Sequence, residues 1–113
     1  MYTHEVMLLK IIYTKSYDST YKDLKKHQHE KDILEKVLKY IARVESFSYM
    51  ICDPLAQVYH FERLKYELNE FYSFRLSKVY RLIVRPRDND IEVELVYISS
   101  NHYVDFDKDR VRL

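Results

Sequence analysis

The chain has 113 residues, a formal net charge of +1 and 47% apolar residues, which predicts one globular domain over residues 1–113 rather than a disordered chain. It contains no glycine and a single cysteine, Cys52, so a glycine-rich nucleotide-binding loop and an internal disulfide are excluded. No Cys/His cluster has metal-ligand spacing, and we expect neither a metal nor a cofactor. No apolar run approaches the roughly 18 residues of a membrane span, and the first twelve residues lack a signal-peptide pattern. We therefore expect a cytoplasmic protein that does not contact a membrane.

The small net charge averages a basic segment and an acidic one. Residues 60–87 carry seven basic and three acidic side chains, a net charge of +4, whereas residues 88–113 carry three basic and seven acidic side chains, a net charge of −4. A basic segment can bind a polyanion such as RNA, and it can equally be the solvated face of a strand. Charge alone leaves both interpretations open.

The first half of the chain predicts a strand followed by two helices. Residues 6–12 are rich in aliphatic and β-branched side chains, which favours a strand. Apolar residues at helical spacing begin at Tyr17 and predict a helix that ends near His29. A second amphipathic pattern over residues 33–42 predicts another helix, so the two form a hairpin or one bent helix.

The second half predicts strands. Residues 46–59 break the helical periodicity, and Pro54 predicts that no helix crosses them. Alternating apolar and polar positions then predict strands at 71–77, 79–86 and 91–98. This order predicts an α+β fold with an N-terminal strand, two helices, and then a three- to four-stranded, mostly antiparallel sheet covered by the helices on one face.

The alternation also predicts which side chains share a face. In the middle strand, Leu82 and Val84 face one side, while Arg81 and Arg85 face the other. The last strand is expected to place one apolar set on a single face: Ile91, Val93, Leu95 and Tyr97. The two strands are joined at residues 88–90, where Asn89 is the residue best suited to a positive φ.

An ordered set of residues in the last half of the chain carries a family resemblance. The run ERLKYELNEFYSFRL at 62–76, the strand YRLIV at 80–84 and the pair His102–Tyr103 resemble the RelE/ParE toxin superfamily, and its YoeB branch most. The first half matches only in its strand–helix–helix order. Glu70 stands where the family has a glycine, so we expect a strained turn there.

The resemblance implies three catalytic residues. Glu62 falls where the YoeB branch has its general base, Arg81 on its phosphate-stabilising arginine and His102 on its general acid. Such a set cleaves RNA by attack of the ribose 2′-hydroxyl, without a metal.

The resemblance also implies residues that bind the substrate. Lys65 matches a lysine near the scissile phosphate, and Tyr103 matches the tyrosine beside the general acid. Arg75, in the same basic segment, is a further candidate for binding RNA. Tyr66, next to Lys65, is a candidate for stacking on a base.

Each of these residues alone has an ordinary explanation. Glu62 at a strand edge and His102 are most simply solvated surface side chains. Arg81 in an alternating strand would ordinarily pair with Glu92 or Glu94 on the neighbouring strand. The joint occurrence of these residue types, in order and within a matching strand pattern, favours the family interpretation.

The family implies a function and its partners. A YoeB-like chain is the toxin of a type II toxin–antitoxin pair, cleaves mRNA in the ribosomal A site, contacts ribosomal RNA, and binds a cognate antitoxin. It reaches operator DNA only through that antitoxin. Two alternatives remain open: a ParE-like toxin that acts on DNA gyrase without acid–base chemistry, and a catalytically degenerate corepressor that only binds the antitoxin. For the acidic tail, residues 104–113, two interpretations also remain open: it lies near the active face, across the basic residues, and modulates the site, or it is a terminus without a role.

Overall fold

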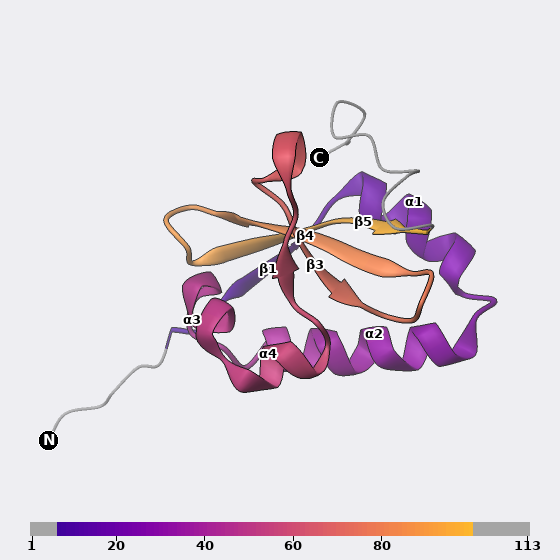
Figure 1. Cartoon of the computed structure of the whole chain (residues 1–113), viewed down its shortest axis with the longest axis horizontal. Helices are drawn as coiled ribbons and strands as arrows, with labels where there is room; N and C mark the ends of the chain where they lie inside the picture. The colour runs from indigo at the N-terminus through magenta and orange to yellow at the C-terminus, as the bar shows by residue number, and fades with distance from the viewer. Residues whose placement is uncertain (1–6, 101–113) are drawn as a thin grey trace, which may run out of the picture.

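The computed structural model describes residues 7–100 (Figure 1). The elements, in chain order, are β1 (Lys10–Tyr13), α1 (Lys15–Leu24), α2 (Gln28–Ile41), α3 (Phe47–Cys52), α4 (Pro54–Val58), β2 (Glu62–Arg63), the 3-10 turn η1 (Tyr66–Leu68), β3 (Tyr72–Arg75), β4 (Arg81–Arg87) and β5 (Glu92–Ser99). Within residues 7–100, no helix is both long enough and apolar enough to cross a membrane.

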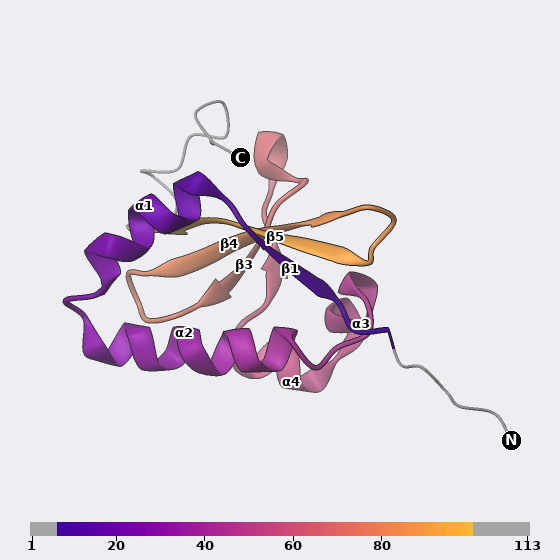
Figure 2. The same cartoon turned by 180° about the vertical axis from the view of Figure 1, so that it is seen from behind.

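The strands form one five-stranded sheet in the order β1-β5-β4-β3-β2. β1 pairs with β5 in parallel, and the other neighbours are antiparallel. The N-terminal strand therefore lies at one edge of the sheet, beside the last strand in the sequence order (Figure 2). The predicted α+β fold is confirmed.

The helical part of the chain differs from the prediction in two places. α1 ends at Leu24, earlier than expected, because the stripe of apolar residues stops there and residues 25–27 are all polar. α1 and α2 are therefore separate helices that form a hairpin (Figures 1 and 2). No helix continues through Pro54, as predicted, yet residues 46–59 contain two short helices, of which α3 ends before Pro54 and α4 begins at it. Pro54 begins α4, a position where its missing N–H is not needed.

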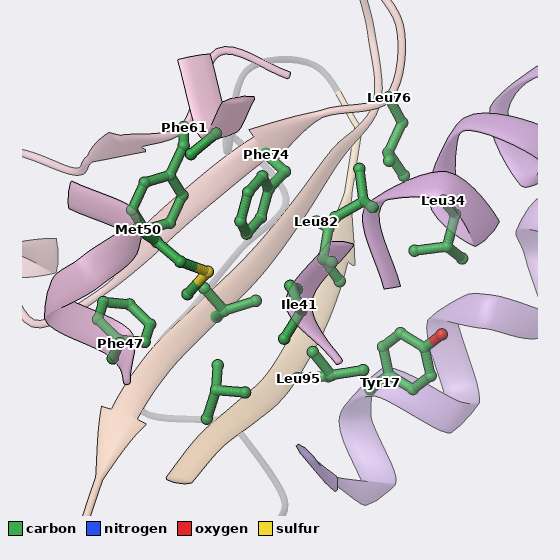
Figure 3. Packing of buried hydrophobic residues seen from close by; sticks show 14 of the residues in the cluster. Tyr17, Leu34, Ile41, Phe47, Met50, Phe61, Phe74, Leu76, Leu82 and Leu95 are labelled. Atoms are coloured by element: carbon green, nitrogen blue, oxygen red, sulfur yellow. The ribbon is translucent and has the colours of Figure 1, made fainter. Parts of the chain in front are cut away.

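The helices pack against one face of the sheet. Phe74 of β3, Leu82 of β4 and Leu95 of β5 are buried on this face, where they join Ile41 of α2 and Phe47 of α3 in the main apolar core (Figure 3). The opposite face carries a smaller buried cluster, made of Leu64, Phe71, Ile83 and Val96. Among residues 7–100, the second face of the sheet is thus covered by the segment between β2 and β3 rather than by the helices.

A bulge in β5 overturns one predicted face. Ile83 pairs with Tyr97 and Val84 pairs with Leu95, so Val96 is an extra residue in β5. The extra residue reverses the alternation beyond it. Tyr97 consequently packs with Ile83 in the smaller cluster, whereas Leu95 lies in the main core.

The turns use positive φ without any glycine. Asp88, Asn89 and Asp90 all have φ between 50° and 78°, so the prediction for Asn89 is confirmed and extends to both neighbours. The strain expected at Glu70 is wrong, because Glu70 does not have a positive φ; between β2 and β3 it is Tyr66 that takes this conformation. The turn between β2 and β3 is formed by η1, which ends two residues before Glu70.

The buried side chain of Thr14 links three elements at the start of α1. Its Oγ1 lies 2.9 Å from the carbonyl oxygen of Leu95 and 3.1 Å from that of Val96, and accepts a hydrogen bond from the N–H of Tyr17 at 3.1 Å. One hydroxyl therefore caps α1 and bonds to the bulged part of β5.

We expect Thr14→Val to lower the free energy of unfolding by about 1–3 kcal/mol, because it keeps the shape of the side chain but leaves a helix N–H and two carbonyls without the hydroxyl. Thr14→Ser keeps the hydroxyl and is the matched control. Urea unfolding followed by circular dichroism measures both. Equal stability of Thr14→Val and the unmodified chain would contradict this role.

Candidate functional site

Three of the predicted site residues lie on the sheet face opposite the helices. Leu82 is buried in the main core, so Arg81 beside it points to the other face. The same alternation in β3 turns Arg75 away from the core that contains Phe74. On β2, Glu62 pairs with Ser73, which precedes Phe74 in β3 and therefore lies on the face opposite the core. Because directly paired residues share a face, Glu62 lies on the same face as both arginines.

Arg75 and Arg81 are direct cross-strand partners in the antiparallel pair of β3 and β4. Like charges placed opposite each other destabilise a sheet. Arg75 is exposed to solvent, but Arg81 is only 4% exposed, so its charge is largely removed from water. The two side chains make a local concentration of positive charge that would suit an anion.

The guanidinium of Arg81 is held by neutral groups. Its Nη1 donates to the carbonyl oxygen of Ser77 at 2.6 Å and to that of Tyr80 at 3.1 Å, both in the turn between β3 and β4. Among residues 7–100, no carboxylate lies within ion-pair distance of Arg81. A buried cation is costly unless a charge of opposite sign compensates it, and here the described surroundings supply only dipoles.

The ordinary partners expected for Arg81 are engaged elsewhere. Buried Glu94 accepts from Arg85 Nε at 2.5 Å and from Arg87 Nη1 at 3.2 Å, and Glu92 lies 3.8 Å from the Nζ of Lys10. Glu94 thus compensates the arginines at the far end of β4. The ordinary alternative for Arg81, a pair with one of these acids, does not occur, because the register places Arg81 opposite Ser99.

Glu62 of β2 lies across β3 from Arg81 of β4. Its partner Ser73 is followed two residues later by Arg75, whose own partner is Arg81. Two strand spacings and two residues along the strand separate the Cα atoms of Glu62 and Arg81 by roughly 12 Å. Long side chains on one face can converge over such a distance, and the small side chain of Ser73 lies between them. Sequence reasoning missed Ser73, although a small polar residue on the polar face of an aromatic strand is a signal for it.

Lys65 and Tyr66 belong to a different part of the site. They lie where the chain leaves β2 for η1, in the segment that projects from the sheet at the top of Figure 1. Lys65 is exposed, and no strand pairing places it beside Arg81. Tyr66 is 86% exposed and has a φ of 58°, an unusual conformation for a bulky residue. The structure therefore separates these two side chains from the row formed by Glu62 and the arginines.

His102 and Tyr103 lie outside the described residues, and so does the tail 104–113. The described chain approaches them at Ser99 of β5, which pairs with Arg81 and precedes His102 by three residues. The register thus brings the last described strand residue next to Arg81.

No cluster of three or more His, Cys, Asp or Glu side chains suited to a metal ion occurs within the described range. The cationic part of the site consists of arginines and a lysine, which bind anions such as phosphate rather than cations.

No family model and no curated protein matches this chain, but its fold is similar to those of several solved toxins. A metal-bound toxin from Helicobacter pylori superposes with a TM-score of 0.62 at 24% identity, over 86% of this chain and 99% of that one. The YoeB–YefM complex from Staphylococcus aureus gives a TM-score of 0.59 at 21% identity, over 82% and 97%. The E. coli DinJ–YafQ toxin–antitoxin complex gives 0.59 at 14%, over 85% and 96%.

These similarities extend over nearly the whole length of each matched toxin chain. The protein thus shares the fold of these toxins, and at the level of the fold this agrees with the resemblance noted in its sequence.

We expect the Arg75–Arg81 pair to bind inorganic phosphate. Replacing Arg75 with Gln should raise stability in chloride by about 0.2–1 kcal/mol, because it removes a like-charge pair. In phosphate at equal ionic strength, the unmodified chain should gain stability and Arg75→Gln should gain less, since an anion bound to the native state stabilises it.

Phosphate also stabilises proteins without binding, by exclusion from their surfaces. The control is therefore Lys78→Gln, which removes one exposed charge outside the pair. Urea midpoints that respond equally to phosphate in all three proteins would contradict a specific anion site.

Proposed function

We propose that this chain is the toxin of a type II toxin–antitoxin pair and acts as a ribosome-dependent endoribonuclease. The observation that carries the proposal is the Arg75–Arg81 pair, in which a buried guanidinium has only neutral described partners. An acid, Glu62, lies on the same face of the sheet. The shared fold with toxins that crystallise with their antitoxins supports the same conclusion.

In the proposed reaction, Glu62 takes the proton from the ribose 2′-hydroxyl, and the 2′-oxygen attacks the adjacent phosphorus. His102 gives a proton to the 5′-oxygen as its bond to phosphorus breaks. The products are a 2′,3′-cyclic phosphate and a 5′-hydroxyl. The proton removed and the proton supplied balance, so the residues supply the chemistry without a metal or cofactor.

Arg81 has a defined role in this scheme. A guanidinium has five N–H donors, and the bonds from Nη1 to Ser77 and Tyr80 fix its plane. Nε and Nη2 then remain to face the phosphate oxygens, whose negative charge grows in the transition state. Because the group is already oriented and largely removed from water, little reorganisation is needed when the charge develops.

The remaining residues bind the RNA. Arg75 contributes a second cation beside Arg81, and Lys65 contacts the backbone from the projecting turn. Exposed Tyr66 offers an aromatic face on which a base can stack, and Tyr103 orients the nucleotide beside His102.

The ribosome would complete the site. Glu62 is exposed on the strand face opposite the helices, and general acid–base catalysis still requires the 2′-oxygen to be in line with the leaving oxygen. mRNA held in the ribosomal A site meets this requirement, with ribosomal RNA as a second contact. The protein would act in the cytoplasm and not at a membrane, bind a cognate antitoxin, and reach operator DNA only through that antitoxin.

Expression without an antitoxin tests the function. We expect incorporation of labelled amino acids to fall before that of labelled thymidine, and purified protein to cleave mRNA bound to ribosomes. Arg81→Gln should lower the cleavage rate by about 10²–10³-fold, as the loss of one preorganised oxyanion donor does. Early loss of thymidine incorporation would favour an action on DNA gyrase, and a folded chain that binds antitoxin but cleaves nothing would be a corepressor.

Arg81→Gln is preferred to Arg81→Ala because the side chain is buried and its truncation would also remove packing. Thermal unfolding shows whether the variant is folded. An unchanged cleavage rate in folded Arg81→Gln would remove Arg81 from the mechanism.

We also expect Tyr66→Ala to weaken binding of ribosome-bound mRNA by about 1–3 kcal/mol, as the loss of one base–aromatic stack does. Tyr66→Phe keeps the ring and should behave like the unmodified protein. Steady-state cleavage at varied ribosome concentration separates a rise in KM from a fall in kcat. If Tyr66→Ala and Tyr66→Phe have the same KM, the exposed ring does not stack on the substrate.

A further inference from the structure

A groove lies away from the proposed catalytic face, between α2 and the two short helices α3 and α4. Its volume is about 440 Å³, and its floor includes Tyr40 and Asp53. The three helices pack on the opposite side of the sheet from Arg75 and Arg81. The proposed catalytic chemistry does not use this groove.

One wall of the groove is apolar and exposed. Leu55 and Val58 of α4 are 62% and 65% exposed, and Tyr49 of α3 is 58% exposed. Three large apolar side chains gathered on two adjacent short helices form the kind of patch that marks a protein-binding surface.

The other wall is basic. Lys36 and Lys39 lie three residues apart on α2, and Arg43 follows in the turn two residues after this helix ends, so that all three line the groove. Within the described residues, the only ion pair among them joins Lys39 to Glu35 at 3.7 Å, and both side chains are well exposed. Such a pair contributes little and can exchange for another carboxylate.

The acid in the floor of the groove does not neutralise this wall by direct contact. Asp53 accepts hydrogen bonds from the Tyr40 hydroxyl at 2.6 Å and from the N–H of Leu55 at 3.1 Å. Burial raises the pKa of the Tyr40 hydroxyl, and its hydrogen bond to Asp53 raises it further, so the hydroxyl remains a donor. The polar groups in the floor thus form hydrogen bonds with other groups of the chain, while the cations of the basic wall are available to bind a ligand.

We propose that this groove binds an acidic amphipathic segment of the antitoxin, with apolar side chains on Leu55, Val58 and Tyr49 and carboxylates toward the three cations of the basic wall. The identification of the partner rests on the proposed function. Exposed aliphatic side chains beside the cations suit a protein segment, because RNA would gain phosphate contacts from the cations but nothing from Leu55 and Val58.

The location of the groove has a consequence for neutralisation. A segment bound there would hold the antitoxin on the helical side, and would leave the Glu62–Arg81 face to another part of the antitoxin or to RNA. Groove variants should therefore keep their ribonuclease activity while they lose antitoxin affinity.

The binding test uses a defined peptide, because the antitoxin has no assigned sequence. The probe is a capped, fluorescein-labelled helix with leucines at i, i+3, i+4 and i+7 and glutamates at its other positions. A second peptide replaces the glutamates with lysines, and a third replaces the leucines with serines. Fluorescence anisotropy of each with the full chain gives the affinities.

We expect the acidic, leucine-containing peptide to bind at least tenfold more tightly than the other two. Leu55→Asp should weaken it about tenfold or more. Arg43→Glu should weaken it several-fold at low salt and by less at high salt. Matched controls outside the groove, Ile51→Asp on α3 and Lys22→Glu on α1, should change the affinity by less than twofold.

Several outcomes would overturn the proposal. They are equal affinity for the acidic and the lysine peptide, equal effects of Leu55→Asp and Ile51→Asp, and a dimer of the chain in sedimentation that Leu55→Asp dissolves. A ribosomal RNA fragment whose binding is lost in Arg43→Glu but kept in Leu55→Asp would instead make the groove a nucleic-acid surface.

A co-expression experiment distinguishes a failure of this proposal from a failure of the proposed function. The chain and its groove variants are co-expressed with the product of the reading frame next to its gene. If the chain cleaves mRNA, Leu55→Asp should remain toxic in the presence of that product, whereas Ile51→Asp should be neutralised. If it cleaves nothing, the function fails, and the peptide titration still decides whether the groove binds its ligand. Neutralisation of Leu55→Asp as efficient as that of Ile51→Asp would overturn the groove as the antitoxin site.

Discussion

The helices cover only one face of the five-stranded sheet, so alternate residues of the strands are committed to the core and the others are left on the opposite side. The burial of Leu82 and Val84 in β4 holds the register, since a slip by one residue would move both out of the main core. Arg81 is thereby fixed on the opposite face, and the pairing of β3 with β4 brings Arg75 beside it. The electrostatic repulsion between these two adjacent cations is offset by the same apolar contacts that stabilise the sheet.

The arginines of β4 have two different kinds of partner. Arg85 and Arg87 share the buried carboxylate of Glu94, and the guanidinium of Arg85 also lies 5.6 Å from the ring centre of Phe71. These charges are part of the structure. Arg81, a few residues earlier, is bound by carbonyl dipoles alone among its described neighbours. The positive potential of β4 is therefore concentrated at one end of the strand, where β5 also reaches its last described residues.

The strand periodicity was sufficient to predict the sheet and the faces of Arg81 and Arg85, because burial imposes an alternation that is visible in the sequence. It was insufficient beyond Val96, since a single extra residue reverses the faces without changing the local composition. The same bulge shifts the register that decides which arginine meets Glu94. α3 and α4 are too short to show a helical period, and a proline that begins a helix looks like one that ends it. The placement of Glu62 on the same face as the arginines depends on a strand of two residues, which is too short to show a periodicity in the sequence.

The pairing of β1 with β5, the first and last described strands, also determines when the chain can fold. Thr14 and Leu95, which are joined through a hydroxyl and a carbonyl, are 81 residues apart in the sequence. During synthesis, β1 and the apolar sides of α1 and α2 emerge long before β5, so the sheet they cover cannot close until most of the chain has left the ribosome. Contacts of such long range fold slowly. The nascent chain therefore passes through an interval in which its helices are open to other proteins, and this interval ends only when its last described strand is in place.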